Sequence, residues 1–244
     1  MLDLKSVSHS TRIRGITVSF ENAQCWHLLG ANGSGKSSLL CAMAGILDSD
    51  GQIRFKSNDI RNMPRDDLAE YRCMLPQQHQ LYFEVSVKEC FFMLHRSHDI
   101  PPLLIESLKL LSLLDKSMFA LSGGEMQRVY LALHLTQIWP AIKRGEALVL
   151  LDEPTQQLDP FFQTKTLELI DSIVGLGNLV IQSHHDINQT LHFASHVILL
   201  KDGQAIDQGS TNCVINQDSM QVVYDQPFME ICEDSSQKRY LVVK

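Results

Sequence analysis

Apolar and polar positions along the chain change period several times, and each change predicts a change of element. Residues 25–47 begin with a short apolar run, pass through a glycine-rich turn and continue at helical spacing, which predicts a strand, a turn and a helix in that order. Residues 147–151 and 179–181 are continuous apolar runs, as in strands that are buried on both faces of a sheet. Because helical patterns separate these strands, we expect a largely parallel sheet of the α/β class.

Residues 87–138 differ in character from the rest of the chain, because their apolar positions recur mainly at helical spacing. Pro101 and Pro102 punctuate the start of one predicted helix. Its apolar face runs through Leu104, Leu108, Leu111 and Leu114. We therefore expect an inserted helical lobe, which we place at residues 79–138.

An Asp-Gly pair at residues 202–203 separates two strand-like segments and predicts a β-hairpin. The residues after this hairpin, 211–244, are polar and weakly patterned, so we expect them to form a short C-terminal extension. Residues 1–78 and 139–210 then form a core that the helical lobe interrupts. The whole chain is expected to be a single domain, because its length suffices for one sizeable core.

Composition and charge exclude some classes of function. Hydrophobic residues make up 44% of the chain and charged residues 20%, as in ordinary globular proteins. The net charge of -7 argues against a nucleic-acid partner, because binding to a phosphate backbone depends on basic residues. The sequence contains neither an apolar run of membrane-spanning length nor a signal-peptide pattern, so we expect a cytoplasmic chain that does not span a membrane itself.

Residues 30–37 match the phosphate-loop (Walker A) pattern G-x-x-x-x-G-K-[ST] in full, between a predicted strand and a predicted helix. Glycines in such a loop let consecutive backbone N–H groups point toward phosphate oxygens, and the helix N-terminus adds partial positive charge. We expect Lys36 to reach the β- and γ-phosphates of ATP and Ser37 to coordinate Mg²⁺. The expected nucleotide-contacting residues of this segment are Gly30, Ala31, Asn32, Gly33, Ser34, Gly35, Lys36, Ser37 and Ser38.

Two carboxylates, Asp152 and Glu153, follow the predicted buried strand at residues 147–151. Because α/β sheets bind ligands at the carboxyl ends of their strands, both should lie near the phosphate loop. Asp152 is then placed to hold Mg²⁺, and Glu153 to act as a general base or to orient the water that attacks the γ-phosphate. The alternative is an ordinary acidic strand end, which the complete phosphate loop upstream disfavours.

A third motif, Leu-Ser-Gly-Gly-Glu-Met-Gln-Arg at residues 121–128, allows two interpretations. Ser122 and Glu125 have the spacing of a capping box, which would simply begin the following helix. A helix N-terminus with a serine and two glycines is also suited to binding phosphate. Both interpretations can hold together, so the local chemistry leaves them open.

The phosphate loop, the L-S-G-G-E-x-Q-R motif and the D-E-P strand end occur in the order found in ATP-binding-cassette (ABC) ATPases. The chain resembles this family over nearly its whole length. The resemblance implies a P-loop NTPase (RecA-like) core with a mostly parallel sheet, an antiparallel β subdomain and an inserted α-helical subdomain. It also implies a head-to-tail homodimer, in which Ser122, Gly123 and Gly124 contact the ATP bound to the phosphate loop of the second copy.

Further residues match functional positions of the family. Gln77, rather than the less favoured Gln78, matches a glutamine that touches Mg²⁺ and the attacking water. His185, in the Ser-His-His-Asp segment at residues 183–186, matches a switch histidine that contacts the γ-phosphate. Asp159 matches a loop that signals across the dimer. The resemblance therefore implies the catalytic residues Glu153, His185 and Gln77 and the Mg²⁺ ligands Ser37, Gln77 and Asp152.

The chain departs from the family pattern where adenine binds. Family members often stack an early aromatic residue on adenine, but residues 1–19 contain no Phe, Tyr or Trp. His9 and Arg12 are the candidates to stack in its place, and weak contacts with the base are the alternative. Gln157 also stands where a small residue is usual.

An ABC subunit without a membrane span implies two integral membrane permease subunits as partners. It also implies a periplasmic substrate-binding protein as an indirect partner, and a peripheral position at the cytoplasmic face of the bacterial inner membrane. Through residues 26–30 and 183–191 the sequence looks closest to vitamin B12 importers, with iron-siderophore and haem importers as alternatives. A non-transport ABC ATPase is disfavoured because such proteins usually carry two cassettes or a long insertion, and a GTPase because the chain has no N-K-x-D element.

Overall fold

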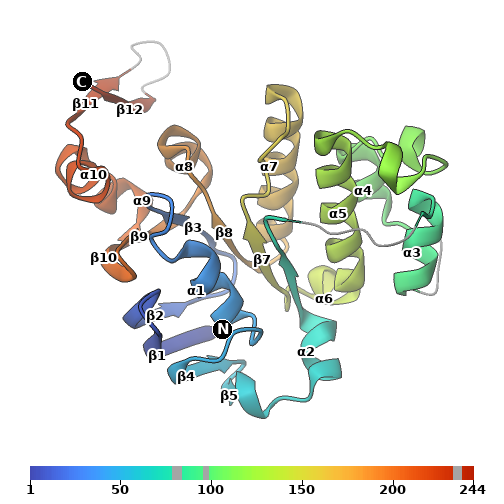
Figure 1. Ribbon diagram of the computed structural model, residues 1–244, viewed down its shortest axis with the longest axis horizontal. Coiled ribbons are helices and arrows are strands. Elements are labelled where there is room, and N and C mark those ends of the chain that lie inside the picture. The colour runs from blue at the N-terminus through green and yellow to red at the C-terminus, as the bar shows by residue number, and fades with distance from the viewer. Residues whose placement is uncertain (79–83, 96–98, 233–237) are drawn as a thin grey trace.

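The computed structural model of the chain describes residues 1–78, 84–95, 99–232 and 238–244. In this described part, the central element is a six-stranded sheet with the order β10-β9-β3-β8-β7-β6 (Figure 1). Its strands are β3 (Cys25–Leu29), β6 (Arg72–Leu75), β7 (Leu148–Asp152), β8 (Leu179–Ser183), β9 (His196–Lys201) and β10 (Gln204–Ser210). All neighbouring pairs except β9 and β10 are parallel, which confirms the predicted mostly parallel sheet and the hairpin at its edge.

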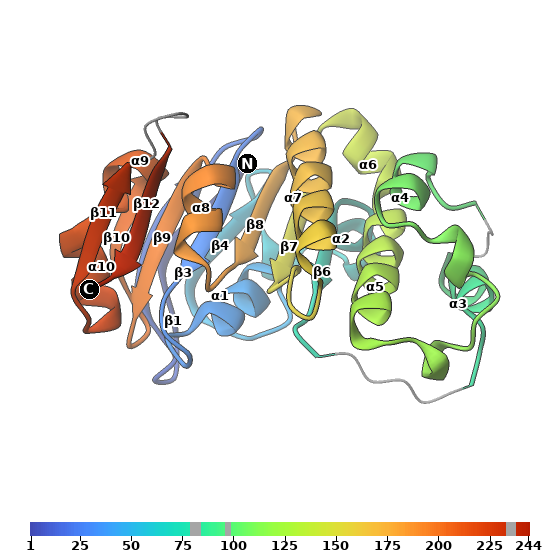
Figure 2. The same cartoon turned by 90° about the horizontal axis from the view of Figure 1, so that it is seen from above.

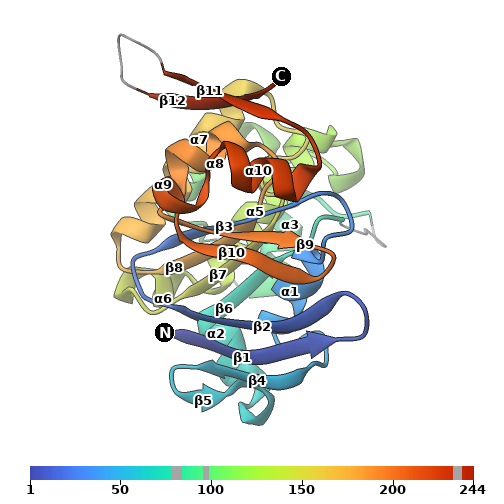
Figure 3. The ribbon, with the colours of Figure 1, turned by 90° about the vertical axis from the view of Figure 1, so that its left-hand side faces the viewer.

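A smaller antiparallel sheet lies beneath the parallel one in Figure 3. Its strands, in spatial order, are β2 (Ile13–Phe20), β1 (Leu2–His9), β4 (Asp50–Phe55) and β5 (Asn58–Asp59). Helix α1 (Lys36–Met43) packs between the two sheets, and α2 (Arg65–Tyr71) leads from the small sheet to β6. Leu40 of α1 is fully buried in one cluster with Leu150 of β7 and Phe20 of β2. Both sheets therefore hold the helix that follows the phosphate loop.

The α-helices between β6 and β8 in the chain lie from the centre to the right of the molecule in Figure 2. They are α3 (Val87–His95), α4 (Pro102–Ser107), α5 (Gly123–Gln137), α6 (Trp139–Arg144) and α7 (Pro160–Gly175). Phe91 of α3 and Leu133 of α5 share a buried cluster with Val149 of β7, so the helices pack directly on the sheet side chains. Residues 79–83 and 96–98 of the predicted lobe lie outside the described residues. No helix in the described ranges has the length and apolar character that a membrane crossing requires.

The expectation of one helix through residues 104–114 is wrong beyond the end of α4. Lys109 adopts a left-handed conformation with φ 50°, which stops the helix. This turn lets Leu108 and Leu110 both point into the core, where each is fully buried, and it leaves Leu111 71% exposed. The burial of two leucines that are two positions apart therefore overrides the helical spacing of the sequence.

Residues 211–244 form more structure than their weak pattern predicts. They contain α9 (Thr211–Val214), α10 (Gln217–Tyr224), β11 (Phe228–Cys232) and β12 (Arg239–Val243), while residues 233–237 lie outside the described residues. Their buried apolar side chains join a cluster that includes Leu199 of β9. Helix α8 (Ile187–Phe193) also holds β12, because the Asn188 amide bonds both the N–H (2.9 Å) and the carbonyl (3.1 Å) of Leu241.

Candidate active site

The phosphate loop, residues 30–37, connects β3 to α1 in a shape that two of its glycines make possible. Gly30 has a φ of 155° and Gly35 a φ of 107°. A Cβ at Gly30 would overlap the carbonyl oxygen of Leu200. A Cβ at Gly35 would likewise overlap the carbonyl oxygen of Arg12. Glycine is therefore needed at both positions for the loop to lie against β9 and the turn between β1 and β2.

Helix α1 begins at this loop without a side-chain cap. Its N-cap residue is the left-handed Gly35, and no side chain in the described part of the protein bonds to the first N–H groups. These N–H groups are available to a ligand, and the positive end of the helix favours a phosphate there. The buried hydroxyl of Ser34 is a further polar group at the loop that has no partner among the described residues.

The side chain of Lys36 lies within the loop rather than in solvent. The residue is 6% exposed, and its ammonium donates to the carbonyls of Gly30 (2.7 Å) and Ala31 (3.1 Å). Burial lowers the pKa of Lys36, while the carboxylates of Glu153 and Asp152 act in the opposite direction. The loop thus presents a partly desolvated positive charge near two negative ones.

Asp152 and Glu153 follow one another at the end of β7, where Ser183 of β8 is in register with Asp152. The Ser183 hydroxyl donates to Asp152 Oδ1 (2.5 Å) and accepts the backbone N–H of Glu153 (2.9 Å). Glu153 has a φ of 50°, a conformation that few residues other than glycine adopt. One hydroxyl therefore orients both acidic residues. Sequence reasoning missed Ser183, because its contacts with the two acids depend on the alignment of β7 with β8, which no local pattern indicates.

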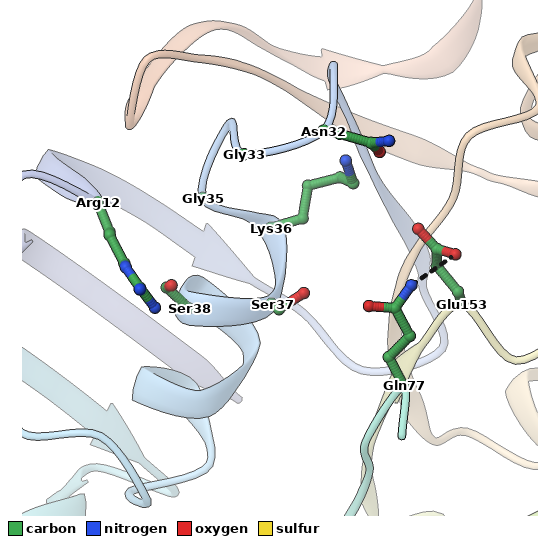
Figure 4. Close-up of a pocket in the computed structure, with 9 residues that line it drawn as sticks. All are labelled: Arg12, Asn32, Gly33, Gly35, Lys36, Ser37, Ser38, Gln77 and Glu153. Carbon is green, nitrogen blue, oxygen red and sulfur yellow. Dashed lines mark hydrogen bonds between the residues drawn. The ribbon is translucent and has the colours of Figure 1, made fainter.

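The carboxylate of Glu153 is where the three predicted catalytic side chains meet. Gln77, which follows β6, donates from Nε2 to Glu153 Oε2 over 3.1 Å (dashed line in Figure 4). His185 Nδ1 lies 4.0 Å from the same oxygen, and the His185 side chain is 63% exposed. Gln77, the favoured of the two glutamine candidates, also lines the cavity beside the phosphate loop. The structure thus brings these three residues together from three separate segments.

This cavity has a volume of about 460 Å³ (Figure 4). It is lined by Arg12, Asn32, Gly33, Gly35, Lys36, Ser37, Ser38, Gln77 and Glu153. Of the two adenine-stacking candidates, Arg12 lines the cavity, as does Ser38 at the start of α1 (Figure 4). The ring of His9 instead lies with Nδ1 2.6 Å from the carbonyl oxygen of Asp48. Of the two candidates, the structure therefore places Arg12 at the cavity and not His9.

The motif at residues 121–128 lies at the N-terminus of α5 and forms the predicted capping box. Ser122 Oγ accepts the N–H of Glu125 (3.3 Å), and the Glu125 carboxylate accepts the N–H of Ser122 (2.9 Å). Lys116 donates to the same carboxylate (2.8 Å). The hydrogen bonds from Lys116 and from the Ser122 backbone lower the pKa of Glu125 to about 2. The start of α5 is therefore explained structurally without any ligand.

A second cavity, of about 510 Å³, adjoins the start of α5. It is lined by Ser122, Gly123, Gly124, Glu125, Arg128, Gln157, Leu158, Asp159 and Phe162. Asp159 caps α7, and Gln157 packs so closely that a Cβ at Gly123 would overlap its side chain. Among the residues that the structure describes, none lines both cavities. The structure thus brings Asp159 to the serine-glycine tip and leaves both apart from the phosphate loop.

The predicted Mg²⁺ ligands supply oxygen atoms from one carboxylate, one hydroxyl and one amide. In the part of the chain that the structure describes, no group of three or more His, Cys, Asp or Glu side chains is arranged to hold a metal ion by itself. Mg²⁺ typically binds one or two carboxylates together with substrate phosphates and water. Ser37, Gln77 and Asp152 therefore fit a Mg²⁺ ion that arrives with a nucleotide.

Comparison with known families decides the class of protein. A protein-family model described as ABC transporter matches residues 13–156, which is more than half of the chain. The chain belongs to the ABC transporter family. The matched segment contains the phosphate loop, the motif at residues 121–128 and both acids at the end of β7. ATP binding and hydrolysis are the activities of the ATPase subunits of this family, so the nucleotide of this ABC ATPase is ATP.

Curated relatives of this ABC ATPase are similar to it along nearly its whole length. It is 33% identical to the vitamin B12 import ATP-binding protein BtuD of Vibrio atlanticus, over 96% of the chain and 97% of the relative. It is 30% identical to the BtuD protein of Photobacterium profundum, over 92% of each chain.

Solved structures confirm the predicted fold class. One is a metal-chelate type ABC transporter in an inward-facing conformation, with a TM-score of 0.79, 21% identity and coverage of 100% of this chain and 96% of the other. Another is cbiO1 from Clostridium perfringens, part of the cbiONQ ABC transporter complex, with a TM-score of 0.73, 24% identity and coverage of 92% and 95%. These neighbours share the mixed fold of a parallel and an antiparallel sheet.

Proposed function

We propose that this chain hydrolyses ATP as one of two copies in an ABC importer, and that the importer carries vitamin B12. The observation that carries the hydrolysis proposal is the convergence of Lys36, Gln77 and Glu153 on one cavity. The cargo proposal is supported by the relatives, which are named as vitamin B12 import proteins and align over nearly the whole chain.

In this proposal the loop binds the triphosphate from one side. Backbone N–H groups of residues 30–37 and the Lys36 ammonium bind the β- and γ-phosphates, because together they supply fixed dipoles and a partly desolvated charge. Ser37, Gln77 and Asp152 would hold Mg²⁺, which would supply positive charge to neutralise the phosphates. The hydrogen bond from the Ser183 hydroxyl to Oδ1 fixes the orientation of the Asp152 carboxylate.

The acidic end of β7 supplies the proton acceptor. Glu153 accepts a proton from the attacking water, since its carboxylate lies at the cavity and no covalent step is needed for phosphoryl transfer to water. Gln77 orients that carboxylate through its 3.1 Å hydrogen bond. His185 contacts the γ-phosphate in this proposal, and its Nδ1 lies 4.0 Å from the same oxygen of Glu153 that Gln77 bonds.

A second copy of the chain completes each site in this proposal. Ser122, Gly123, Gly124 and Asp159 line a cavity that is separate from the one at the phosphate loop. A head-to-tail partner can bring this tip to the γ-phosphate of the first chain, where the helix N-terminus would favour the charge. The two nucleotides then hold the two chains together until hydrolysis removes the γ-phosphates.

We further propose how the chain is divided and where it works. Residues 1–78 and 139–210 act as the nucleotide-binding core, residues 79–138 as a helical subdomain and residues 211–244 as an extension. The helical subdomain docks on two integral membrane permease subunits, to which a periplasmic substrate-binding protein delivers cargo. Met93 and Leu94 of α3, which are 55% and 63% exposed, support such a docking surface. The chain would then lie peripherally at the cytoplasmic face of the inner membrane.

Uptake in cells that lack this chain tests the proposal. Cells that express the wild-type chain should take up labelled cyanocobalamin, and cells that express Lys36→Ala should not. Labelled ferric siderophore and haem serve as the competing cargoes. Unchanged B12 uptake with a loss of iron-chelate or haem uptake would move the assignment to those importers, and unchanged uptake of all three would favour a non-transport ATPase.

A further inference from the structure

Two buried imidazoles lie near the acidic end of β7. His27 belongs to β3, the strand that leads into the phosphate loop, and is fully buried. His184 follows β8 and is 1% exposed. Their rings are stacked, with centroids 5.1 Å apart and planes within 5° of one another. The pair thus connects the strand of the phosphate loop with the segment that carries His185.

The hydrogen bonds of His184 identify its protonation state. The backbone N–H of Asp186 donates to His184 Nδ1 over 3.3 Å, so Nδ1 carries no proton. The Nε2 atom then carries the ring proton and donates to Thr155 Oγ1, 3.3 Å away. Thr155 is itself 4% exposed and stands two residues after Glu153. A neutral His184 therefore ties the loop after Glu153 to the loop around His185.

His27 also supports the backbone at Asp186, through Thr190. The amide nitrogen of Gln182 contacts His27 Nε2, so His27 carries its proton on Nδ1 and donates it to Thr190 Oγ1 over 2.9 Å. Thr190 in turn donates to the carbonyl of Asp186 over 3.0 Å. The N–H and the carbonyl of Asp186 are thus both held by the network, one through His184 and the other through His27 and Thr190.

We propose that His184 is a positioning residue for ATP hydrolysis, which fixes His185 and Glu153 relative to one another. The proposal rests on the proposed function, in which those two residues act on the γ-phosphate and the attacking water. His185 lies between two residues whose positions the network sets, and its ring lies 5.9 Å from that of His184. Burial and the neighbouring His185 lower the pKa of His184, which is consistent with the neutral form that both hydrogen bonds require.

The expected effect is on the chemical step rather than on ATP binding. The phosphate loop keeps its own contacts when His184 is changed, whereas a small displacement of Glu153 or His185 misaligns the groups that act on water. A displacement on the order of 1 Å can cost about 100-fold in rate. A histidine that merely fills space would affect the melting temperature and leave the kcat of the folded protein unchanged.

The test compares three substitutions of this residue in the full-length chain. His184→Leu removes both hydrogen bonds, His184→Asn keeps an acceptor for the Asp186 N–H, and His184→Gln keeps a donor toward Thr155. We expect kcat to fall by about 10- to 100-fold in the first variant and by less in the other two, with KM for ATP within about twofold of wild type. His134→Leu, which replaces a histidine of α5 outside the site, is the matched control and should leave kcat unchanged.

Thr155→Val tests the same contact from the other side and serves if His184→Leu fails to fold. It should lower kcat in the same way, and the double variant should be no slower than His184→Leu alone, since both changes break one contact. Wild-type kcat in Thr155→Val and in the folded His184 variants, or a rise in KM equal to the fall in kcat, would overturn the proposal. Lys36→Ala run in parallel separates the two failures, because full turnover by that variant would instead overturn the proposed function.

Discussion

Helices α1 and α5 both begin at a glycine-rich motif, but their first turns are completed in different ways. The N-cap of α1 is the left-handed Gly35, and within the described ranges no side chain caps its N–H groups. The N-cap of α5 is Ser122, whose hydroxyl forms a complete capping box with Glu125. The phosphate loop therefore indicates its ligand through its own chemistry, whereas the tip of α5 acquires a ligand only in the proposed pair of chains.

The charges at the two helix tips differ as well. Lys36 is buried and lies near Asp152 and Glu153. The Ser183 hydroxyl bonds the carboxylate of the first acid and the backbone N–H of the second. At α5, the pair of Lys116 and Glu125 has side-chain exposures of 44% and 23%. Such exposed ion pairs contribute little to stability. Changes at α1 should therefore alter ATP binding and turnover, and changes at α5 should alter pairing.

The largest effect is expected when the charge at the α1 tip is removed. Lys36→Ala should weaken ATP binding by about 100-fold and bring turnover below detection, because a buried charge-assisted contact with phosphate is lost. Nucleotide binding followed by fluorescence and phosphate release measure the two quantities. Lys116→Ala at the α5 tip is the matched control and should bind ATP as the wild type does. Normal turnover by Lys36→Ala would contradict the claim that the loop before α1 binds ATP through Lys36.

A large effect on turnover alone is expected at Glu153. Glu153→Gln should bind ATP normally and hydrolyse it about 100- to 10,000-fold more slowly, because it removes the proton acceptor and keeps the side-chain shape. ATP should then trap a dimer that gel filtration detects. Glu125→Gln at the other helix tip should hydrolyse ATP within a few-fold of wild type. A monomer with unchanged turnover would exclude Glu153 as the base.

Two substitutions of Ser122 sharpen the comparison on its α5 side. Ser122→Arg should bind ATP as a monomer but fail to dimerise with it, because a bulky cation occupies the space meant for the partner's phosphate. Ser122→Ala should remove the cap and lower the free energy of unfolding by about 1 kcal/mol. If Ser122→Arg combined with Glu153→Gln still dimerises with ATP, the tip has only its capping role.

Acid should destabilise the segment around His184, near the phosphate loop, before it affects the capping box of α5. The pKa of His184 is lowered from 6.5 to about 4, chiefly by burial, so unfolded chains bind a proton that the folded chain resists. The contribution of neutral His184 to the free energy of unfolding is complete above pH 6.5 and declines as the pH falls toward 4. The loss is about 2 kcal/mol between pH 7 and pH 5. Burial lowers the pKa of His27 in the same direction.

The capping carboxylate of α5 behaves differently over this range. The lowered pKa of Glu125, about 2 against a usual 4.5, gives a contribution that is present above pH 4.5 and lost only below it. Urea unfolding at pH 7, 6 and 5 measures the difference. His184→Asn should lose less stability over this range than wild type, and equal losses in the two chains would contradict the assignment.

The smallest effect is expected at Arg12, the candidate for the adenine contact. Arg12→Ala should weaken ATP binding by about three- to tenfold, as expected for the loss of one cation–π contact, and should leave turnover at saturating ATP unchanged. Arg12→Tyr should restore the affinity, because an aromatic ring also stacks on adenine. Arg14→Ala, which lines a different cavity, is the control. Equal affinity in the wild type and Arg12→Ala would remove Arg12 from the site.

The parts of the fold that the sequence predicted are those with strong local patterns. The strands β3, β7 and β8 are buried along their whole length, and the phosphate loop has one shape that its glycines permit. The turn at Lys109 was not predictable from the sequence. The apolar residues there have helical spacing, but the helix ends because Leu108 and Leu110 are both buried in the core. The helices and strands within residues 211–232 and 238–244 also escaped prediction, because they depend on packing against β9 and α8.

The residues of the site also fall into those that local motifs predict and those that only the fold brings together. Lys36, Asp152 and Glu153 follow from motifs at strand ends, and the structure places them together. Ser183 and the link from His184 to Thr155 join segments about 30 residues apart, and only the alignment of β7 with β8 makes them neighbours. Contacts between parallel strands carry no local sequence signature, so such residues emerge from the fold alone.

A crystal structure of Glu153→Gln with ATP and Mg²⁺ tests the central claim most directly. The account predicts a head-to-tail pair in which Ser122 Oγ and the N–H groups of Gly123 and Gly124 lie within hydrogen-bonding distance of a γ-phosphate bound to Lys36 of the other copy. A structure in which ATP occupies the phosphate loop while both α5 tips remain far from any nucleotide would contradict it.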